Sequence, residues 1–235
     1  MRCKRVLKIL LITIIVAGTS ACVEVGELKE ETQTIQLGEA ESVELELNMG
    51  AGELRLQGGV GELMEGTFLY NVDRWKPEID YYVSGNRGIL KIRQGKKSGI
   101  PVGKTRNKWD INLSNDVPLD IEINFGAGEG KLDFRGLTLS SLDIDMGVGD
   151  LIVDLSGEQR QNLDVSIDGG VGSGTVYLPE NIGVRVHVDG GIGSISAKGM
   201  NRDGKVYTND AYGKTDVSID IKIDAGIGSI DLKLK

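Results

Sequence analysis

The sequence predicts an all-β protein: a solenoid, or right-handed β-helix-like stack of coils, with an antiparallel meander near its N-terminal end. Three observations predict this fold. A glycine-rich motif repeats along the chain, apolar and polar residues alternate on both sides of it, and no amphipathic helical pattern follows the first residues. A β-sandwich with glycine-rich corners is the alternative architecture.

The repeated motif consists of an Asx residue, any residue, and two glycines that flank one small apolar residue. Glycine tolerates positive φ, so each glycine pair permits a sharp bend, and we expect the residue between the glycines to point inward and fill the corner. The Asx positions are Asn48, Asn124, Asp145, Asp168, Asp189 and Asp224, and the glycine pairs of three successive motifs are Gly147/Gly149, Gly170/Gly172 and Gly191/Gly193.

The spacing of the motif suggests coils. From Gly126 to Gly191 the first glycines are 21, 23 and 21 residues apart, and 35 residues then separate Gly191 from Gly226. A period of this length with two strands predicts stacked coils, so that Asp145, Asp168 and Asp189 lie in consecutive coils, and Gly149, Gly172 and Gly193 occupy the same corner of each. The longer interval suggests that residues 199–213 form a loop inserted into one coil.

The predicted domain spans residues 43–235, with regular coils over 119–235. Residues 60–118 interrupt the period and read as a meander that could cover one end of the solenoid. Residues 22–42 are polar and rich in Glu, which favours a flexible tether.

The first 21 residues have the features of a signal peptide. Four basic residues precede the apolar run Ile9–Val16, which is too short to span a bilayer as a helix. Small residues then lead to Cys22, which resembles the lipobox of bacterial lipoproteins, although Thr19 stands where that pattern prefers Leu. The resemblance implies lipidation of Cys22 and attachment to the extracytoplasmic side of a bacterial membrane; cleavage after Ala21 without lipidation is the alternative.

The net charge of the chain limits the classes of partner that it can bind. Removing residues 1–21, which carry four positive charges and no acid, changes the net charge from −8 to −12. Such a charge argues against nucleic acid as a partner.

The repeated motif, together with the block LMEGTFLYN…RWKPEIDYYVSGNRGILKI, resembles the toast-rack domain family of bacterial envelope proteins, including relatives of the Lia-type envelope-stress system. It is also similar to adhesin-like GxG β-repeat proteins. The resemblance covers about 43–235 and implies coil stacking and an envelope location. It carries over no catalytic residue.

The Asx column has two interpretations. In an Asx-turn each side chain accepts a hydrogen bond from a backbone N–H two residues on, which suits Asn and Asp equally. Stacked carboxylates could instead bind Ca²⁺. The calcium β-roll repeat GGxGxD needs Asp where this chain has Gly174 and Ile195, so we expect no metal and no cofactor. His187, the single histidine, has no nucleophile placed beside it by the sequence, and we expect no enzyme activity.

A basic and aromatic segment is the candidate partner surface. From Arg87 to Lys108 there are eight bases and no acid, and aromatic residues gather nearby. Such a segment could meet anionic headgroups, wall polymers or an acidic protein. Alternatively, its bases offset the acidic coils and its aromatics pack a cap onto the solenoid. The candidate residues are Arg87, Lys96, Lys97, Lys104, Arg106, Lys108, Trp75 and Trp109.

The predicted function is a lipid-anchored structural or protein-interaction module of the cell envelope, with envelope-stress sensing as its context. The membrane is the expected partner of the N-terminal lipid, and an envelope protein or polymer that of the domain. The alternatives are an adhesin or glycan-binding module and, third, an envelope hydrolase.

Overall fold

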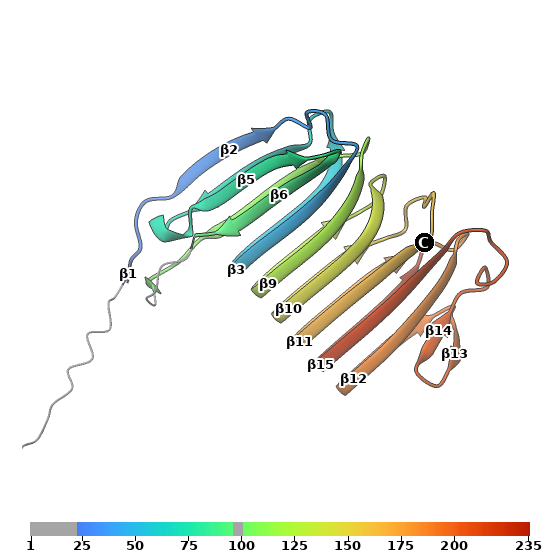
Figure 1. The fold of residues 1–235 in the computed structure, drawn as a ribbon. Helices are drawn as coiled ribbons and strands as arrows, with labels where there is room; N and C mark the ends of the chain where they lie inside the picture. The colour runs from blue at the N-terminus through green and yellow to red at the C-terminus, as the bar shows by residue number, and fades with distance from the viewer. Residues whose placement is uncertain (1–22, 96–100) are drawn as a thin grey trace, which may run out of the picture.

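A computed structural model describes residues 23–95 and 101–235. In this part of the chain, six long, bent, parallel strands lie side by side like the bars of a rack (Figure 1). Each coil is thus one continuous strand that bends at its glycine pair, where two strands per period were predicted. In spatial order they are β3 (Ser42–Val60), β9 (Pro118–Asp133), β10 (Thr138–Asp154), β11 (Leu163–Leu178), β15 (Ser218–Leu234) and β12 (Gly183–Lys198).

The alternation seen in the sequence forms the core. In β3, β9, β10 and β15, apolar side chains at every second position are buried on both sides of the bend, and the polar side chains between them face outward. Residues from before the bend (Ile167, Ile223) and after it (Leu151, Ile230) line one small internal hollow. The two halves of each strand therefore enclose a single core between them.

The order of the coils corrects the sequence-based prediction. Strand β15, the last in the chain, lies between β11 and β12 and pairs with both in parallel. Asp168 and Asp189 are therefore not in consecutive coils, because Asp224 separates them. Residues 199–213 therefore do not form a loop inserted into one coil; they lie in the connection that carries the chain away from β12 before it returns as β15.

The glycine pairs also differ from the prediction, since they lie within the long strands and form no separate turn. Gly149 and Gly172 have the expected positive φ and lie in register with each other. Gly193 was predicted to follow Gly172 in the next coil, and that expectation is wrong, because Gly228 lies between them. It lies in register with Gly228, and its φ falls outside the left-handed range. Glycine is required at Gly193 by packing alone, because a Cβ there would overlap the carbonyl oxygen of Gly228.

The N-terminal end of the stack is a coil cut in two. Strands β6 (Arg87–Gln94) and β8 (Asn107–Ser114) pair in parallel with the first and second halves of β3. Antiparallel strands then cover both: β5 (Pro77–Ser84) on β6, and β4 (Met64–Tyr70) on β8. The region predicted as a meander does cap the stack, but two of its strands continue the parallel sheet. The turn η1 (Asp73–Trp75) joins β4 to β5.

The predicted tether is partly a strand. Within residues 22–42, β2 (Lys29–Ile35) pairs antiparallel with β4 from Lys29↔Tyr70 to Ile35↔Met64. The Thr residues and Ile35 give this polar segment strand propensity, which its high Glu content concealed. Further upstream, β1 (Val23–Glu24) pairs with β7 (Pro101–Val102).

At the other end, the hairpin of β13 (Asn201–Asp203) and β14 (Val206–Thr208) pairs antiparallel with the first half of β12. Tyr207 closes the core there and is buried. Among the described residues, no helix is long and apolar enough to cross a membrane.

Candidate interaction surface

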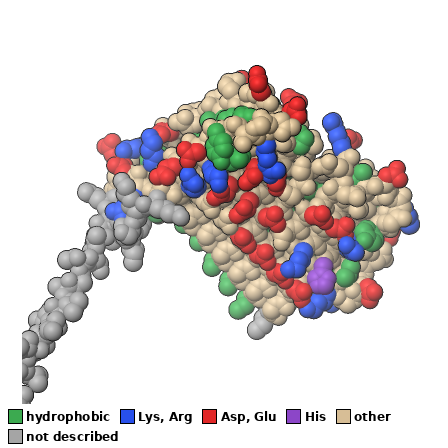
Figure 2. Space-filling view, viewed as in Figure 1, with side chains coloured by type: hydrophobic (Ala, Val, Ile, Leu, Met, Phe, Trp, Pro, Cys, Tyr) green, Lys and Arg blue, Asp and Glu red, His purple; other side chains and the backbone are tan. Residues whose placement is uncertain are grey.

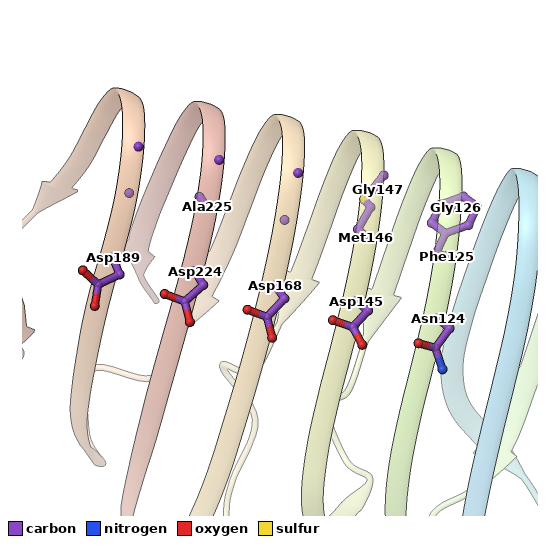
Figure 3. Close-up of a pocket in the computed structure, with 15 residues that line it drawn as sticks. Asn124, Phe125, Gly126, Asp145, Met146, Gly147, Asp168, Asp189, Asp224 and Ala225 are labelled. Carbon is purple, nitrogen blue, oxygen red and sulfur yellow. The ribbon is translucent and has the colours of Figure 1, made fainter.

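The Asx residues form one column across the long strands. Strand register places Asn48, Asn124, Asp145, Asp168, Asp224 and Asp189 opposite one another in that order. Neighbouring members are therefore about 4.8 Å apart along the sheet. Figure 3 shows the last five as a row of side chains that point the same way, each from its own strand. They line a shallow groove of about 770 Å³ beside the bend.

These side chains do not form the predicted Asx-turns. Instead, Asn48 and Asn124 donate to the Glu side chains two residues earlier, at 2.7 and 2.8 Å. Asp224 pairs with Lys222 at 2.5 Å, and Asp189 accepts from Lys205 and lies 3.0 Å from His187. The glycines bend a continuous strand, so the Asx side chain stays in the outward-facing row and does not reach the backbone.

Acidic side chains extend the column into a face. The neighbouring outward row holds Glu46, Glu122 and Asp143 in register, and Figure 2 shows acidic side chains running diagonally over this side of the molecule. Partial burial and the negative charges of Asp120 and Glu122 raise the pKa of Asp143. Lysine and histidine partners lie at both ends of the face, on β15, β12 and the C-terminal hairpin and, for Glu46, on β6 through Lys91, so the middle of the face keeps its negative charge.

Carboxylates in this face are spread along rows and do not converge. Over residues 23–95 and 101–235, no group of three or more His, Cys, Asp or Glu side chains is placed to hold a metal ion. Likewise, in the described chain no hydroxyl group is hydrogen-bonded to His187, whose side chain contacts Asp189.

In the five strands where its side chain is described, the residue between the glycines points outward, which corrects the prediction that it fills the corner. Val148, Val171 and Ile227 are 53%, 48% and 55% exposed. They form an aliphatic ridge with Ala51 and Ala127 along the outside of the bend. The corner is filled from inside by the residue after the Asx: Met49, Phe125 or Met146. The repeat revealed this row, but not which way it faces.

The described residues of the predicted basic and aromatic surface do not form one patch. Trp109 is fully buried and meets Phe68 edge-on with ring centroids 5.5 Å apart, so it belongs to the core and cannot contact a partner. Trp75 lies half-buried in η1. The alternation within β8 explains the position of Trp109: it shares the inward row with Ile111 and Leu113.

The bases occupy two regions. Arg87, at the start of β6, pairs with Glu44 and Asp120 at 2.9 and 2.7 Å, whereas Arg106 lies near the bend, 3.7 Å from Glu53. These contacts favour the charge-balancing interpretation for Arg87. Lys104 is exposed and Lys108 half-buried; Lys96 and Lys97 lie outside the described residues, as does Cys22.

The order and geometry of these strands agree with known proteins. The family model described as "N-terminal domain of toast_rack, DUF2154" matches residues 24–177, and that described as "Cell wall-active antibiotics response LiaF, C-terminal" matches residues 126–232. Comparison with curated proteins found no match.

A crystal structure of a "putative cell adhesion protein" from Clostridium sporogenes is 40% identical, covers 89% of this chain and 100% of its own, and superposes with a TM-score of 0.86. A "putative adhesin" from Bacteroides fragilis covers 89% of this chain and 99% of its own, but at 11% identity and a TM-score of 0.33 it supports no conclusion. The first family model spans well over half of the chain, and the chain therefore belongs to the toast-rack family.

Proposed function

We propose that this protein is a lipid-anchored, extracytoplasmic module of the bacterial cell envelope that binds another envelope component and acts in the response to envelope stress. The observation that carries the proposal is the described surface, which consists of long rows of side chains with open grooves between them. Such a surface suits contact with an extended or large partner. The LiaF-type match over 126–232 supports the stress-response context.

The pairing of β1 with β7 supports an anchor at Cys22. Val23 lies opposite Pro101, a few residues before Lys104 and Arg106. A lipid on Cys22 would therefore enter the membrane close to this basic segment. One acyl chain binds membranes only weakly, and a chain combined with nearby basic residues binds stably. In this arrangement the acidic coils extend away from the anionic surface.

Replacement of Cys22 tests the anchor. We expect Cys22→Ser to release the protein from membranes or to leave residues 1–21 attached, and to abolish labelling with a radioactive fatty acid. Cys3→Ser is the matched control, because it removes the other cysteine of the chain and should leave both properties unchanged. A Cys22→Ser protein that still partitions into detergent with its signal removed would contradict lipidation.

Crosslinking in intact envelopes tests the binding role. We expect a lysine-reactive crosslinker to join the wild-type protein reproducibly to a defined envelope component. An unrelated lipoprotein at the same abundance should not capture that component. If the two proteins capture the same background, the interaction role is wrong.

Adhesion to a surface polymer or glycan is the second candidate, favoured by the name of the 40% identical Clostridium sporogenes protein. Glycan sites usually present exposed aromatic rings. In the described chain, Tyr82 is the aromatic residue among the large exposed apolar side chains, at 52% exposure. Loss of polymer binding in Tyr82→Ala would support this candidate.

A further inference from the structure

The two ends of the solenoid are covered unequally. Within residues 23–95 and 101–235, each end coil has a half before the bend and a half after it. At the N-terminal end, β5 covers the first half and β4 the second. At the C-terminal end, β14 covers the first half of β12, but no described strand pairs with the outer edge of its second half, Ile192–Lys198.

The inward side chains of β12 are buried where the hairpin covers the strand and more exposed where it does not. Beneath the hairpin, Val184, Val186 and Val188 are at most 2% exposed. After the bend, Ile195 is 39% exposed, although it occupies the same inward row as Leu54, Leu151 and Ile230, which are 2–8% exposed. A row that belongs to the core is therefore open to solvent at this one place.

The composition of the open edge is equally unusual. Natural edge strands carry charges, Pro or bulges that prevent pairing with other chains. The stretch GGIGSISA, residues 190–197, contains no charged residue and no Pro, and Lys198 follows directly after it. Alternate residues of a strand direct both N–H and C=O to the same side, so about half of these backbone groups face away from β15 without a strand to pair with.

We propose that a single extended segment of another envelope protein completes this end by pairing with Ile192–Lys198. The proposal deepens the proposed function by giving the interaction module a binding edge. Addition of a strand to a free sheet edge is a common mode of peptide recognition, in which the backbone supplies affinity and alternate side chains supply specificity.

The neighbouring strands indicate how the segment would lie. All three covered half-coils at the ends are covered by antiparallel strands, so we infer an antiparallel segment. The residues opposite Ile195 and Ala197 would face the core and be apolar. Lys198 lies in register with Lys233, and a carboxylate beside Lys198 would relieve the repulsion between these two cations. The expected pattern is acidic, apolar, polar, apolar.

A second copy of this chain fits the edge less well than a single strand. Beside the first half of β12, the β13–β14 hairpin adds two more strands to the sheet. Beside the second half of β12, no described strand follows (Figure 1). Edge-to-edge pairing of two copies would bring their two hairpins into the same space. A single strand paired with the second half of β12 meets no such obstacle, because the hairpin pairs with the first half only.

A matched pair of substitutions tests the edge. Ile195→Lys places a charge in the inward row, where it reaches solvent in the free protein but would be buried by an added strand. Ile152→Lys makes the same change at an outward position of β10 with nearly the same exposure, 37% against 39%. Both variants should melt within a few degrees of wild type.

The readout is photo-crosslinking from position 196 of the full-length protein in intact cells, with the crosslinked peptide sequenced. We expect an adduct with an extended segment of the predicted pattern. Its yield should fall at least about tenfold with Ile195→Lys and stay unchanged with Ile152→Lys, because burying an unpaired ammonium is costly. An adduct with a second copy of this chain, or one that Ile195→Lys does not affect, would overturn the proposal. So would the absence of any adduct. If lysine crosslinking still captures a partner equally with wild type and Ile195→Lys, the binding role stands and only this edge is wrong.

Discussion

The second glycine of the motif is fixed by its neighbour in the adjacent coil. At Gly149 and Gly172 the backbone φ is 140° and 149°, a region that L-residues rarely adopt. In addition, a Cβ on Gly172 would overlap the carbonyl oxygen of Gly149, and one on Gly228 that of Gly172. At these positions the bend therefore depends on glycine twice, for its backbone angle and for the close approach of the stacked coils.

Other glycines leave space. In each coil, two inward positions face each other across the bend. They hold Phe125 and Gly130 in β9, and Met146 and Leu151 in β10. In β11 both positions are glycine, Gly169 and Gly174, and a Cβ on either would contact nothing. A small apolar hollow of about 70 Å³ results.

Valine at two positions of one strand should therefore have opposite effects. Gly174→Val should raise the free energy of unfolding by about 1–2 kcal/mol, because it fills the hollow and favours the strand. Gly172→Val should lower it by about 3 kcal/mol or more, through strain and overlap with Gly149. Chemical denaturation measures both. Equal destabilisation by the two changes would mean that the hollow is not available to a side chain.

At the scale of the strand, the motif and the inward and outward rows on either side of the bend could be predicted from the sequence, because alternation and glycine spacing are local; the outward row at the bend itself was not predicted. The order of the coils could not. The rows of β15 match those of β11 and of β12 equally well: Asp224 can stand beside Asp168 or Asp189, and Ile223 beside Ile167 or Val188. Nothing in the local pattern decides between these neighbours. Trp109 differs, because the local alternation with Ile111 and Leu113 already places it in the inward row, and its burial agrees with the alternative that the aromatics pack the cap.

The acidic rows oppose folding electrostatically. Because partial burial and the neighbouring carboxylates raise the pKa of Asp143, the folded state binds its proton more tightly than the unfolded state. Ionisation of Asp143 therefore lowers stability as the pH rises through its folded pKa. We expect Asp143→Asn to raise the Tm at pH 7 and low salt. The gain should shrink as the pH falls below the ordinary Asp range, where the wild-type carboxyl is protonated in both states. Asp116→Asn, at an exposed loop position, should have little effect at any pH.

The Asx column should not act as a calcium site. Asp189 and Asp224 are paired with cationic side chains, and the remaining carboxylates are spread along the rows without converging. We therefore expect millimolar Ca²⁺ to leave the Tm unchanged. A site occupied at 100 times its Kd would add about 2.7 kcal/mol, and a thermal melt would detect it. An upward shift that disappears in Asp168→Ala would show that the column does bind the ion.

At the scale of the whole molecule, the two ends of the stack differ: one lies beside the basic segment and the other has an uncovered strand edge. The N-terminal end carries the basic segment beside β1 and is capped on both halves. At the far end the acids of the column are paired with Lys205, His187 and Lys222, and the second half of β12 is open. This polarity suits a protein held at one end by a membrane and free to bind at the other.

The basic segment should strengthen attachment to an anionic membrane. A variant with Lys96, Lys97, Lys104 and Arg106 changed to Gln should bind vesicles of anionic lipid far less than wild type at low salt. Each base near such a surface contributes about 1 kcal/mol. Wild-type binding should itself fall steeply with salt, since exposed charges are screened beyond about 8 Å at 0.15 M.

The control variant loses the same number of positive charges at other places. Four exposed residues of the coils and loops are changed to Gln: Lys131, Arg160, Lys198 and Lys214. Both variants should be made in a soluble domain that begins at Val23, so that the vesicles report the basic segment without the lipid or the signal. If the two variants co-sediment with vesicles equally, position does not matter and only net charge does. The basic segment would then serve to offset the acidic coils, as the pairing of Arg87 with Glu44 and Asp120 already indicates for that residue.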